Sequence, residues 1–302
     1  MRKSIAALSA LALSALALTG CSAAPTFDGA ACDRSSSAGL AASVNASGDI
    51  GTPQVGLSMP VRASEVKYAD LIVGDGAAIT SETQNAIMAR VLLNGTTGEL
   101  IQQPGNSVWS PQSATAELAG VDEALRCATE GSRIVVAIPA ADLAEGLPEQ
   151  IGLGADDSLV AVYDVRYTLL SKAEGRDVFN AARGLPSVVR APDGRPGIIV
   201  PGTAAPKDAV TETLIEGEGD KVGDGAPMFN YTAVGWSDRE VTGTSWDGQV
   251  LIDTQSLPAE VGEAISEATV GSQLMVVVPG DSDATVYVVD VLGIIPEELT
   301  QG

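Results

Sequence analysis

The stretch TVGSQLMVVVPG (269–280) decides the fold of this chain, because TEGSRIVVAIPA (129–140) has almost the same pattern. Extending the comparison upstream aligns VDEALRCATEGSRIVVAIPA (121–140) with VGEAISEATVGSQLMVVVPG (261–280) without a gap, and nine of the twenty positions are identical. Chance rarely produces such a density of identities. The sequence therefore predicts a tandem duplication.

Each copy predicts a short helix followed by a buried strand. Residues 263–268 combine good helix formers with apolar side chains three and four apart, and Gly271 suits the positive φ of a C-terminal turn. The β-branched run LMVVVP (274–279) then predicts a strand that ends at proline. Upstream segments alternate apolar and polar residues between Gly- and Asp-rich turns. Together these patterns predict an α+β fold in which each copy has a curved antiparallel sheet wrapped on one short helix.

The charge balance restricts the function. The chain of 302 residues has 39 acidic and 17 basic side chains, a formal charge of −22, and no histidine. A chain without histidine excludes Ser-His-Asp hydrolysis and most zinc sites, and such an acidic chain repels nucleic acid. The four carboxylates of EGEGDKVGDG (216–225) lack the ordered spacing of a calcium loop and indicate a solvated turn. We therefore expect no metal and no cofactor.

The N-terminus has the proportions of a secretory signal. Two cations precede an apolar stretch in residues 1–20, and LTGC (18–21) resembles the lipobox of bacterial lipoproteins. We expect a signal peptide over residues 1–20, a lipid on Cys21, and a flexible Ala-, Ser- and Gly-rich spacer over residues 21–47. An ordinary signal peptide with a chance cysteine is the alternative.

Two further cysteines remain once Cys21 carries the lipid. Cys32 and Cys127 are an even pair in an oxidising compartment, so the sequence predicts a disulfide between them. Two separate buried thiols are the alternative.

Several blocks of the second copy resemble a known family. NYT (230–232), SWD (245–247), ATVGS (268–272) and VVDVLG (288–293) are similar, in order, to FKBP-type peptidyl-prolyl isomerases, in particular to tandem lipoproteins of actinobacteria. The internal repeat extends this resemblance to the first copy. We expect a degenerate first FKBP-like domain over residues 48–172 and a second over residues 173–302.

The resemblance implies an aromatic pocket for a prolyl side chain, between the helix and a half-wrapped five-stranded sheet. The candidate pocket residues of the second copy are Tyr231, Trp246, Leu257 and Tyr287. The alternative for both tyrosines is an ordinary place in the core of the sheet. Trp246 is either a structural plug or a wall of the pocket.

Other pocket positions depart from the family pattern. The family motif FDSSW is replaced by residues 242–246, TGTSW, and Glu260 or Val261 replaces the tryptophan at the start of the helix. In the first copy, Arg90 or Val91 is near the tyrosine position, and Glu145 replaces another tyrosine. Two of the three phenylalanines, at 27 and 179, fall outside both expected cores. These departures predict weak catalysis in the second copy and none in the first.

Two functional classes remain open. The first is a lipid-anchored, extracytoplasmic prolyl isomerase or proline-recognising folding helper, whose partners are proline-containing secreted or cell-surface polypeptides. The second is a non-catalytic FKBP-like scaffold or binding lipoprotein. A solute-binding lipoprotein, a third class, usually has larger α/β lobes with parallel sheets.

Overall fold

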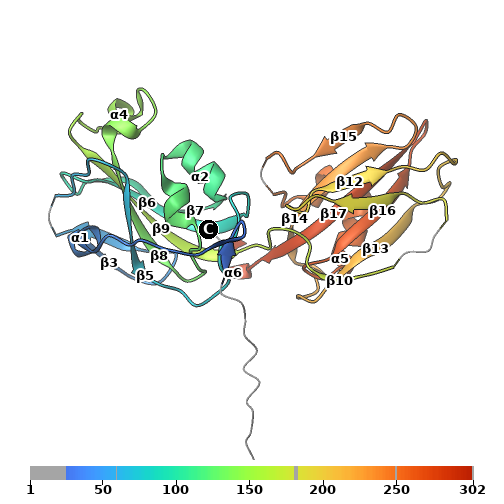
Figure 1. Cartoon of the computed structure of the whole chain (residues 1–302), viewed down its shortest axis with the longest axis horizontal. Helices are drawn as coiled ribbons and strands as arrows, with labels where there is room; N and C mark the ends of the chain where they lie inside the picture. Colours follow the sequence, from blue (N-terminus) through green and yellow to red (C-terminus); the bar gives the residue numbers. More distant parts are fainter. Residues whose placement is uncertain (1–24, 59, 180–182, 249, 301–302) are drawn as a thin grey trace, which may run out of the picture.

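The computed structural model describes residues 25–58, 60–179, 183–248 and 250–300, and the chain forms two lobes side by side (Figure 1). We call residues 25–169 the N-lobe and residues 173–300 the C-lobe. The expected signal peptide (1–20) and Cys21 lie outside the described residues.

Each lobe is built on one antiparallel sheet. The N-lobe elements are β1 Thr26–Phe27, β2 Ala30–Ala31, α1 Ala38–Ser43, β3 Val44–Ser47, β4 Gln54–Leu57, β5 Lys67–Ile72, β6 Ala86–Asn94, β7 Leu100–Trp109, α2 Pro111–Glu117, α3 Val121–Leu125, β8 Arg133–Pro139, η1 Ala140–Asp142, α4 Leu147–Gln150 and β9 Ser158–Thr168. The C-lobe elements are β10 Gly175–Asp177, β11 Ser187–Arg190, β12 Pro196–Ile199, β13 Val210–Gly217, β14 Ala226–Gly235, β15 Val241–Thr244, η2 Thr254–Ser256, α5 Ala259–Glu267, β16 Gln273–Pro279, β17 Ala284–Ile295 and α6 Glu297–Thr300.

The two sheets share one strand order. The N-lobe sheet runs β5-β8-β9-β6-β7, and the C-lobe sheet runs β13-β16-β17-β14-β15 with the short β10 added beside β13. Numbered within each lobe, both orders are first, fourth, fifth, second, third. Because two unrelated segments have no reason to share this order, the topology agrees with the duplication seen in the sequence.

The repeated Thr-x-Gly-Ser motif forms the same turn in both lobes. Thr129 Oγ1 donates to the carbonyl of Gly74 at 2.7 Å, and the Gly74 N–H donates to Ser132 Oγ at 3.0 Å. In the C-lobe, Thr269 and Ser272 hold Gly217 in the same way, at 2.8 and 3.1 Å.

Glycine is required on both sides of this contact. A Cβ on Gly217 would lie 2.3 Å from the Val270 carbonyl oxygen, and Gly271 has a φ of +94°. The motif is therefore repeated because it ties the C-terminal end of the first strand to the turn before the fourth.

Both faces of each sheet are covered. Helix α3 in the N-lobe and helix α5 in the C-lobe pack on one face, where their apolar side chains join the strands in one cluster. On the opposite face lie the hairpins β3–β4 and β11–β12, whose members Val44 and Val188 pack against the strands. The repeated unit therefore includes a hairpin upstream of the five strands.

Three sequence expectations need correction. Residues 25–47 are not a flexible spacer, because Phe27, Leu40 and Val44 are buried in the N-lobe. Phe27 therefore belongs to a core that was expected to exclude it. The N-lobe helix layer also contains α2 beside α3, rather than one helix, and the Ser110 side chain caps α2.

The lobes meet through apolar side chains. Ile87 and Leu169 of the N-lobe share a buried cluster with Met228, Val250 and Leu292 of the C-lobe. The Leu170 N–H also donates to the carbonyl of Leu292 at 3.0 Å. No helix among the described residues is long and apolar enough to cross a membrane.

Candidate functional site

Three of the four predicted pocket residues lie together in the C-lobe. Tyr231 on β14 and Tyr287 on β17 are stacked, with ring centroids 6.3 Å apart and planes inclined by 30°. Both are half-buried and belong to the same cluster as Leu257, which precedes α5. We call Tyr231, Leu257 and Tyr287 the tyrosine cluster. Its core side contacts the packed interface between α5 and the sheet, and its outer side faces solvent.

Hydrogen bonds hold the backbone of Tyr231, and a glycine leaves space for its side chain. The Tyr231 N–H donates to Ser245 Oγ at 3.0 Å, and that hydroxyl donates to Asn230 Oδ1 at 2.9 Å. A Cβ on Gly243 would lie 2.9 Å from the Tyr231 hydroxyl, so glycine makes room for it. Burial, and secondarily the neighbouring Tyr231, raises the pKa of Tyr287. The Tyr287 hydroxyl is therefore protonated at neutral pH and can donate a hydrogen bond.

Trp246 lies apart from the tyrosine cluster. After Ser245 the chain leaves β15 in a turn, closed by a 3.1 Å hydrogen bond from the Gly248 N–H to the Ser245 carbonyl. Trp246 instead lines a cavity of about 290 Å³ with Asn85 and Ser110 of the N-lobe. Because the turn redirects the chain, the structure does not bring Trp246 together with the two tyrosines, and its role as a plug or as a pocket wall stays a prediction.

A charged side chain occupies the equivalent place in the N-lobe. Arg90 faces Tyr163 across β6–β9, as Tyr231 faces Val289 across β14–β17. Arg90 is 5% exposed, and its guanidinium lies 4.8 Å from the centroid of the Trp109 ring. Arg90 Nη2 also pairs with Glu117 Oε1 at 2.7 Å, and this contact lowers the pKa of Glu117. The N-lobe position is therefore filled by an ion pair.

Tyr163 shows that this N-lobe position is closed to solvent. The side chain is fully buried, and burial raises its pKa to about 12 although Arg90 acts in the opposite direction. The Trp109 and Tyr163 rings meet edge to face, with centroids 6.1 Å apart. The sequence placed Arg90 near this position. Trp109, Glu117 and Tyr163 were missed, and the only signal was the scarcity of aromatics, at 4% of residues.

A buried carboxylate occupies the middle of the fifth strand of each sheet. In the N-lobe, Asp164 accepts from Arg133 Nε and Nη2 at 2.7 and 2.8 Å, and both side chains are fully buried. In the C-lobe, Gln273 replaces the arginine and donates to Asp290 at 2.7 Å. Burial raises the pKa of Asp290 to about 6, although Gln273, the Ala173 N–H and Arg190 lower it.

These carboxylates organise chain segments that precede each sheet. Asp164 accepts from the Gly51 N–H at 2.7 Å, and Asp290 accepts from the Ala173 N–H at 2.9 Å. Arg133 also donates to the carbonyls of residues 47, 48 and 49. The two carboxylates have a structural role, because hydrogen-bond donors of the protein already occupy their oxygens.

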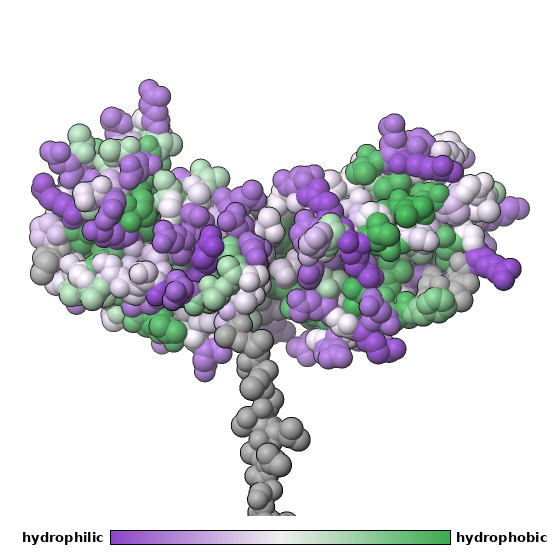
Figure 2. Space-filling view, viewed as in Figure 1, coloured by the Kyte–Doolittle hydropathy of each residue, from purple (hydrophilic) through white to green (hydrophobic). Residues whose placement is uncertain are grey.

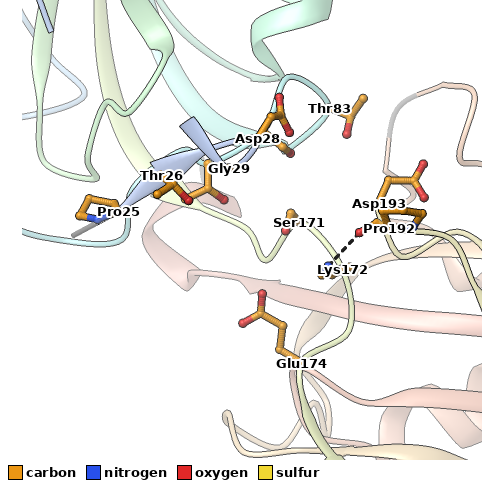
Figure 3. Close-up of a pocket in the computed structure, with 12 residues that line it drawn as sticks. Pro25, Thr26, Asp28, Gly29, Thr83, Ser171, Lys172, Glu174, Pro192 and Asp193 are labelled. Carbon is orange, nitrogen blue, oxygen red and sulfur yellow. Dashed lines mark hydrogen bonds between the residues drawn. The ribbon is translucent and has the colours of Figure 1, made fainter. Parts of the chain in front are cut away.

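A polar cavity of about 670 Å³ lies between the lobes (Figure 3). Its walls come from the N-terminal segment with Asp28, from the link between the lobes, and from the turn with Asp193. Lys172 spans part of it by donating to the Pro192 carbonyl at 2.9 Å. No group of three or more His, Cys, Asp or Glu side chains in the described ranges is arranged to hold a metal ion. This cavity has no aromatic floor for a prolyl ring.

Exposed apolar side chains gather on another part of the C-lobe (Figure 2). Val189 on β11, Ile199 on β12 and Val241 on β15 are each more than half exposed. Because β11 and β12 cover the face of the sheet opposite to α5, this surface is separate from the tyrosine cluster.

The structure contains the cysteine bridge expected from the sequence. Cys32 and Cys127 are disulfide-bonded, with Cα atoms 5.7 Å apart and a separation of 95 positions in the sequence. The bridge ties the segment after β2 to the turn after α3. Cys21, the expected lipid site, lies outside the described residues.

Comparisons with known proteins find only solved structures with low TM-scores. No family model matches the chain, and no curated protein matches it. The three FKBP domains of wheat FKBP73 match with a TM-score of 0.33 and 12% identity, over 76% of this chain and 94% of that one. FkpA from Escherichia coli matches with a TM-score of 0.28 and 16% identity, over 34% of this chain and 47% of that one. A putative peptidyl-prolyl isomerase, FKBP12 from Mycobacterium tuberculosis, matches with a TM-score of 0.26 and 19% identity, over 35% of this chain and 85% of that one. Such low scores assign no family.

Proposed function

We propose that this protein is a lipid-anchored, extracytoplasmic folding helper of the FKBP type, with two tandem FKBP-like domains. Its C-lobe binds proline residues of secreted or cell-surface polypeptides through the tyrosine cluster and isomerises them weakly. One observation carries the proposal. Tyr231 and Tyr287 stack beside α5, at positions where the sequence blocks resemble the proline pocket of that family.

The chemistry needs neither a general base nor a metal. The barrier to X–Pro rotation is amide resonance, about 20 kcal/mol, and the twisted amide is less polar than the planar one. Aromatic walls that exclude water therefore favour the twisted state. The two rings supply such a wall, and the Tyr287 hydroxyl supplies a donor.

The same geometry keeps the rate low. The tyrosines contact each other, and only Leu257 of the other pocket candidates joins them. The N-lobe contributes no second site, because the buried Arg90 and its ion pair with the partly exposed Glu117 fill the equivalent position.

Replacing Tyr231 by alanine is expected to reduce the acceleration of X–Pro isomerisation about tenfold, because one aromatic wall is worth about 1–1.5 kcal/mol. Protease-coupled isomerisation of a short proline peptide by the detergent-solubilised full chain measures this rate. Tyr231→Phe is the matched control and keeps most of the acceleration, since it keeps the ring. An unchanged rate in Tyr231→Ala contradicts the site.

A non-catalytic binding role is the second candidate, and the Tyr231–Tyr287 stack itself favours it. In that case, the wild-type chain binds a proline peptide without accelerating its isomerisation. The same assay combined with a binding titration separates the two functions.

The anchor rests on the signal-like N-terminus and on the disulfide, which is typical of oxidising compartments. We expect palmitate labelling of cells expressing the full chain to mark this protein, and Cys21→Ala to abolish the label. Cys32→Ala is the control and leaves the label in place. Equal labelling of the Cys21→Ala variant contradicts the anchor.

A further inference from the structure

A second cavity lies where the end of the N-lobe sheet meets the C-lobe. It has a volume of about 830 Å³, and we call it the junction cavity. Tyr167 comes from the end of β9, and the rest of the wall comes from the loop before β14, the turn after α5 and the C-terminal segment. The lining residues are Tyr167, Gly219, Asp220, Asp224, Gly225, Ala226, Val270, Ile294, Ile295, Pro296 and Glu297.

The lining combines an apolar wall with negative charge. Val270, Ile294, Ile295 and the Tyr167 ring supply apolar surface, and three carboxylates supply the charge. The lining contains neither lysine nor arginine. Lys221 lies between the two aspartates in sequence, but its side chain is exposed and is not part of the wall.

Among the residues that the structure describes, no cation is ion-paired with either aspartate. Asp220 also acts on the Tyr167 hydroxyl. Burial is the main cause that raises the pKa of Tyr167, and the charges of Glu130 and Asp220 add to it. The Tyr167 ring is therefore close enough to Asp220 for the charge of this carboxylate to act on it.

We propose that the junction cavity binds an alkylammonium cation, a primary ammonium group on an apolar stem. The ammonium group lies between Asp220 and Asp224, and the stem packs on Tyr167 and the isoleucines. A cation over a tyrosine ring gains further attraction from the ring face. Anions are repelled, and a bare metal ion gains nothing from the apolar wall.

This site is independent of the tyrosine cluster and of prolyl isomerisation. Two sources present the same chemistry, a free polyamine and a lysine side chain of a polypeptide. Because Tyr167 belongs to the N-lobe and the aspartates to the C-lobe, an occupant contacts both lobes and favours their docked arrangement.

Titration calorimetry of the detergent-solubilised full chain with n-pentylamine tests the proposal, with n-pentanol as the uncharged probe. We expect pentylamine to bind and pentanol to bind at least tenfold more weakly. Asp220→Asn and Asp224→Asn each raise the Kd for pentylamine about fivefold, and added salt weakens binding. Asp281→Asn, an equal change of charge on the exposed β16–β17 turn, leaves the Kd unchanged.

Ala226→Phe is the steric test, because its ring fills the cavity without changing the charge, and it abolishes pentylamine binding. Unfolding curves followed by tryptophan fluorescence show that each variant folds. Spermidine and an acetyl-Gly-Lys-Gly-amide peptide distinguish the two sources, and binding of either one supports the site. Equal affinity for pentylamine and pentanol, full binding by folded Ala226→Phe, or equal losses in Asp281→Asn and Asp220→Asn overturn it.

Discussion

Replacing Arg133 by methionine is expected to lower the free energy of unfolding of the N-lobe by about 3–5 kcal/mol. The guanidinium forms a bidentate ion pair with Asp164, and both side chains are fully buried. The variant leaves the Asp164 carboxylate without a cation in the buried core of the N-lobe. It also removes the donor for the carbonyls of residues 47–49.

Urea unfolding followed through Trp109, the only tryptophan of the N-lobe, measures this loss. Lys67→Met is the matched control. Its ion pair with Glu65 is 3.3 Å long and largely exposed, so its loss is expected to cost less than about 1 kcal/mol. The account fails if both methionine variants lose the same amount.

The second large effect is a dependence of C-lobe stability on pH, caused by Asp290. Burial raises the pKa of this carboxyl to about 6 in the folded chain, and the unfolded chain has an ordinary value near 4. Between these values the native state binds more protons than the unfolded state. The stabilisation is therefore fully present below about pH 4, and it is lost as the pH rises through 6.

The shift of about two units corresponds to about 3 kcal/mol. We expect Asp290→Asn to remove the dependence, because an amide retains an acceptor for the Ala173 N–H without the cost of burying charge. Urea unfolding at pH 4 to 8 is the measurement. The stability of the variant relative to wild type rises by about 3 kcal/mol across this range. Asp281→Asn, which alters an exposed carboxylate, shows no such rise, and a constant difference for Asp290→Asn contradicts the assignment.

The repeat made much of the fold predictable. Residues 121–140 and 261–280 have nine identities, and they form a helix, a glycine turn and a strand in both lobes. These features depend on local pattern, since helix spacing, positive φ and β-branched runs are visible within twenty residues. The antiparallel sheets followed from the same local signals.

Apart from the cysteine bridge, contacts between distant residues were not predictable. The Ala-, Ser- and Gly-rich composition of residues 25–47 is typical of a spacer, yet the bridge at Cys32 and the burial of Leu40 and Val44 fix this segment to strands beyond residue 60. Such burial depends on tertiary structure and leaves no periodic trace in a short, small-residue segment.

The candidate site likewise contains contacts that the sequence predicts and contacts that it does not. Tyr231 and Tyr287 occupy adjacent strands of one sheet, so strand pairing brings them together. Trp246 follows two residues after the end of β15, and a turn places it in a cavity that N-lobe residues also line. The junction cavity needs residues 167, 220 and 294, which no motif connects.

The disulfide also has a mechanical consequence. A pull on the chain at Pro25 can peel away β1 and β2, but only as far as Cys32. That limits the slack to about 25 Å for seven extended residues. Beyond it, tension passes through sulfur directly to the turn after α3. The disulfide thus stops the unzipping under load before it reaches α1 and the strands that follow.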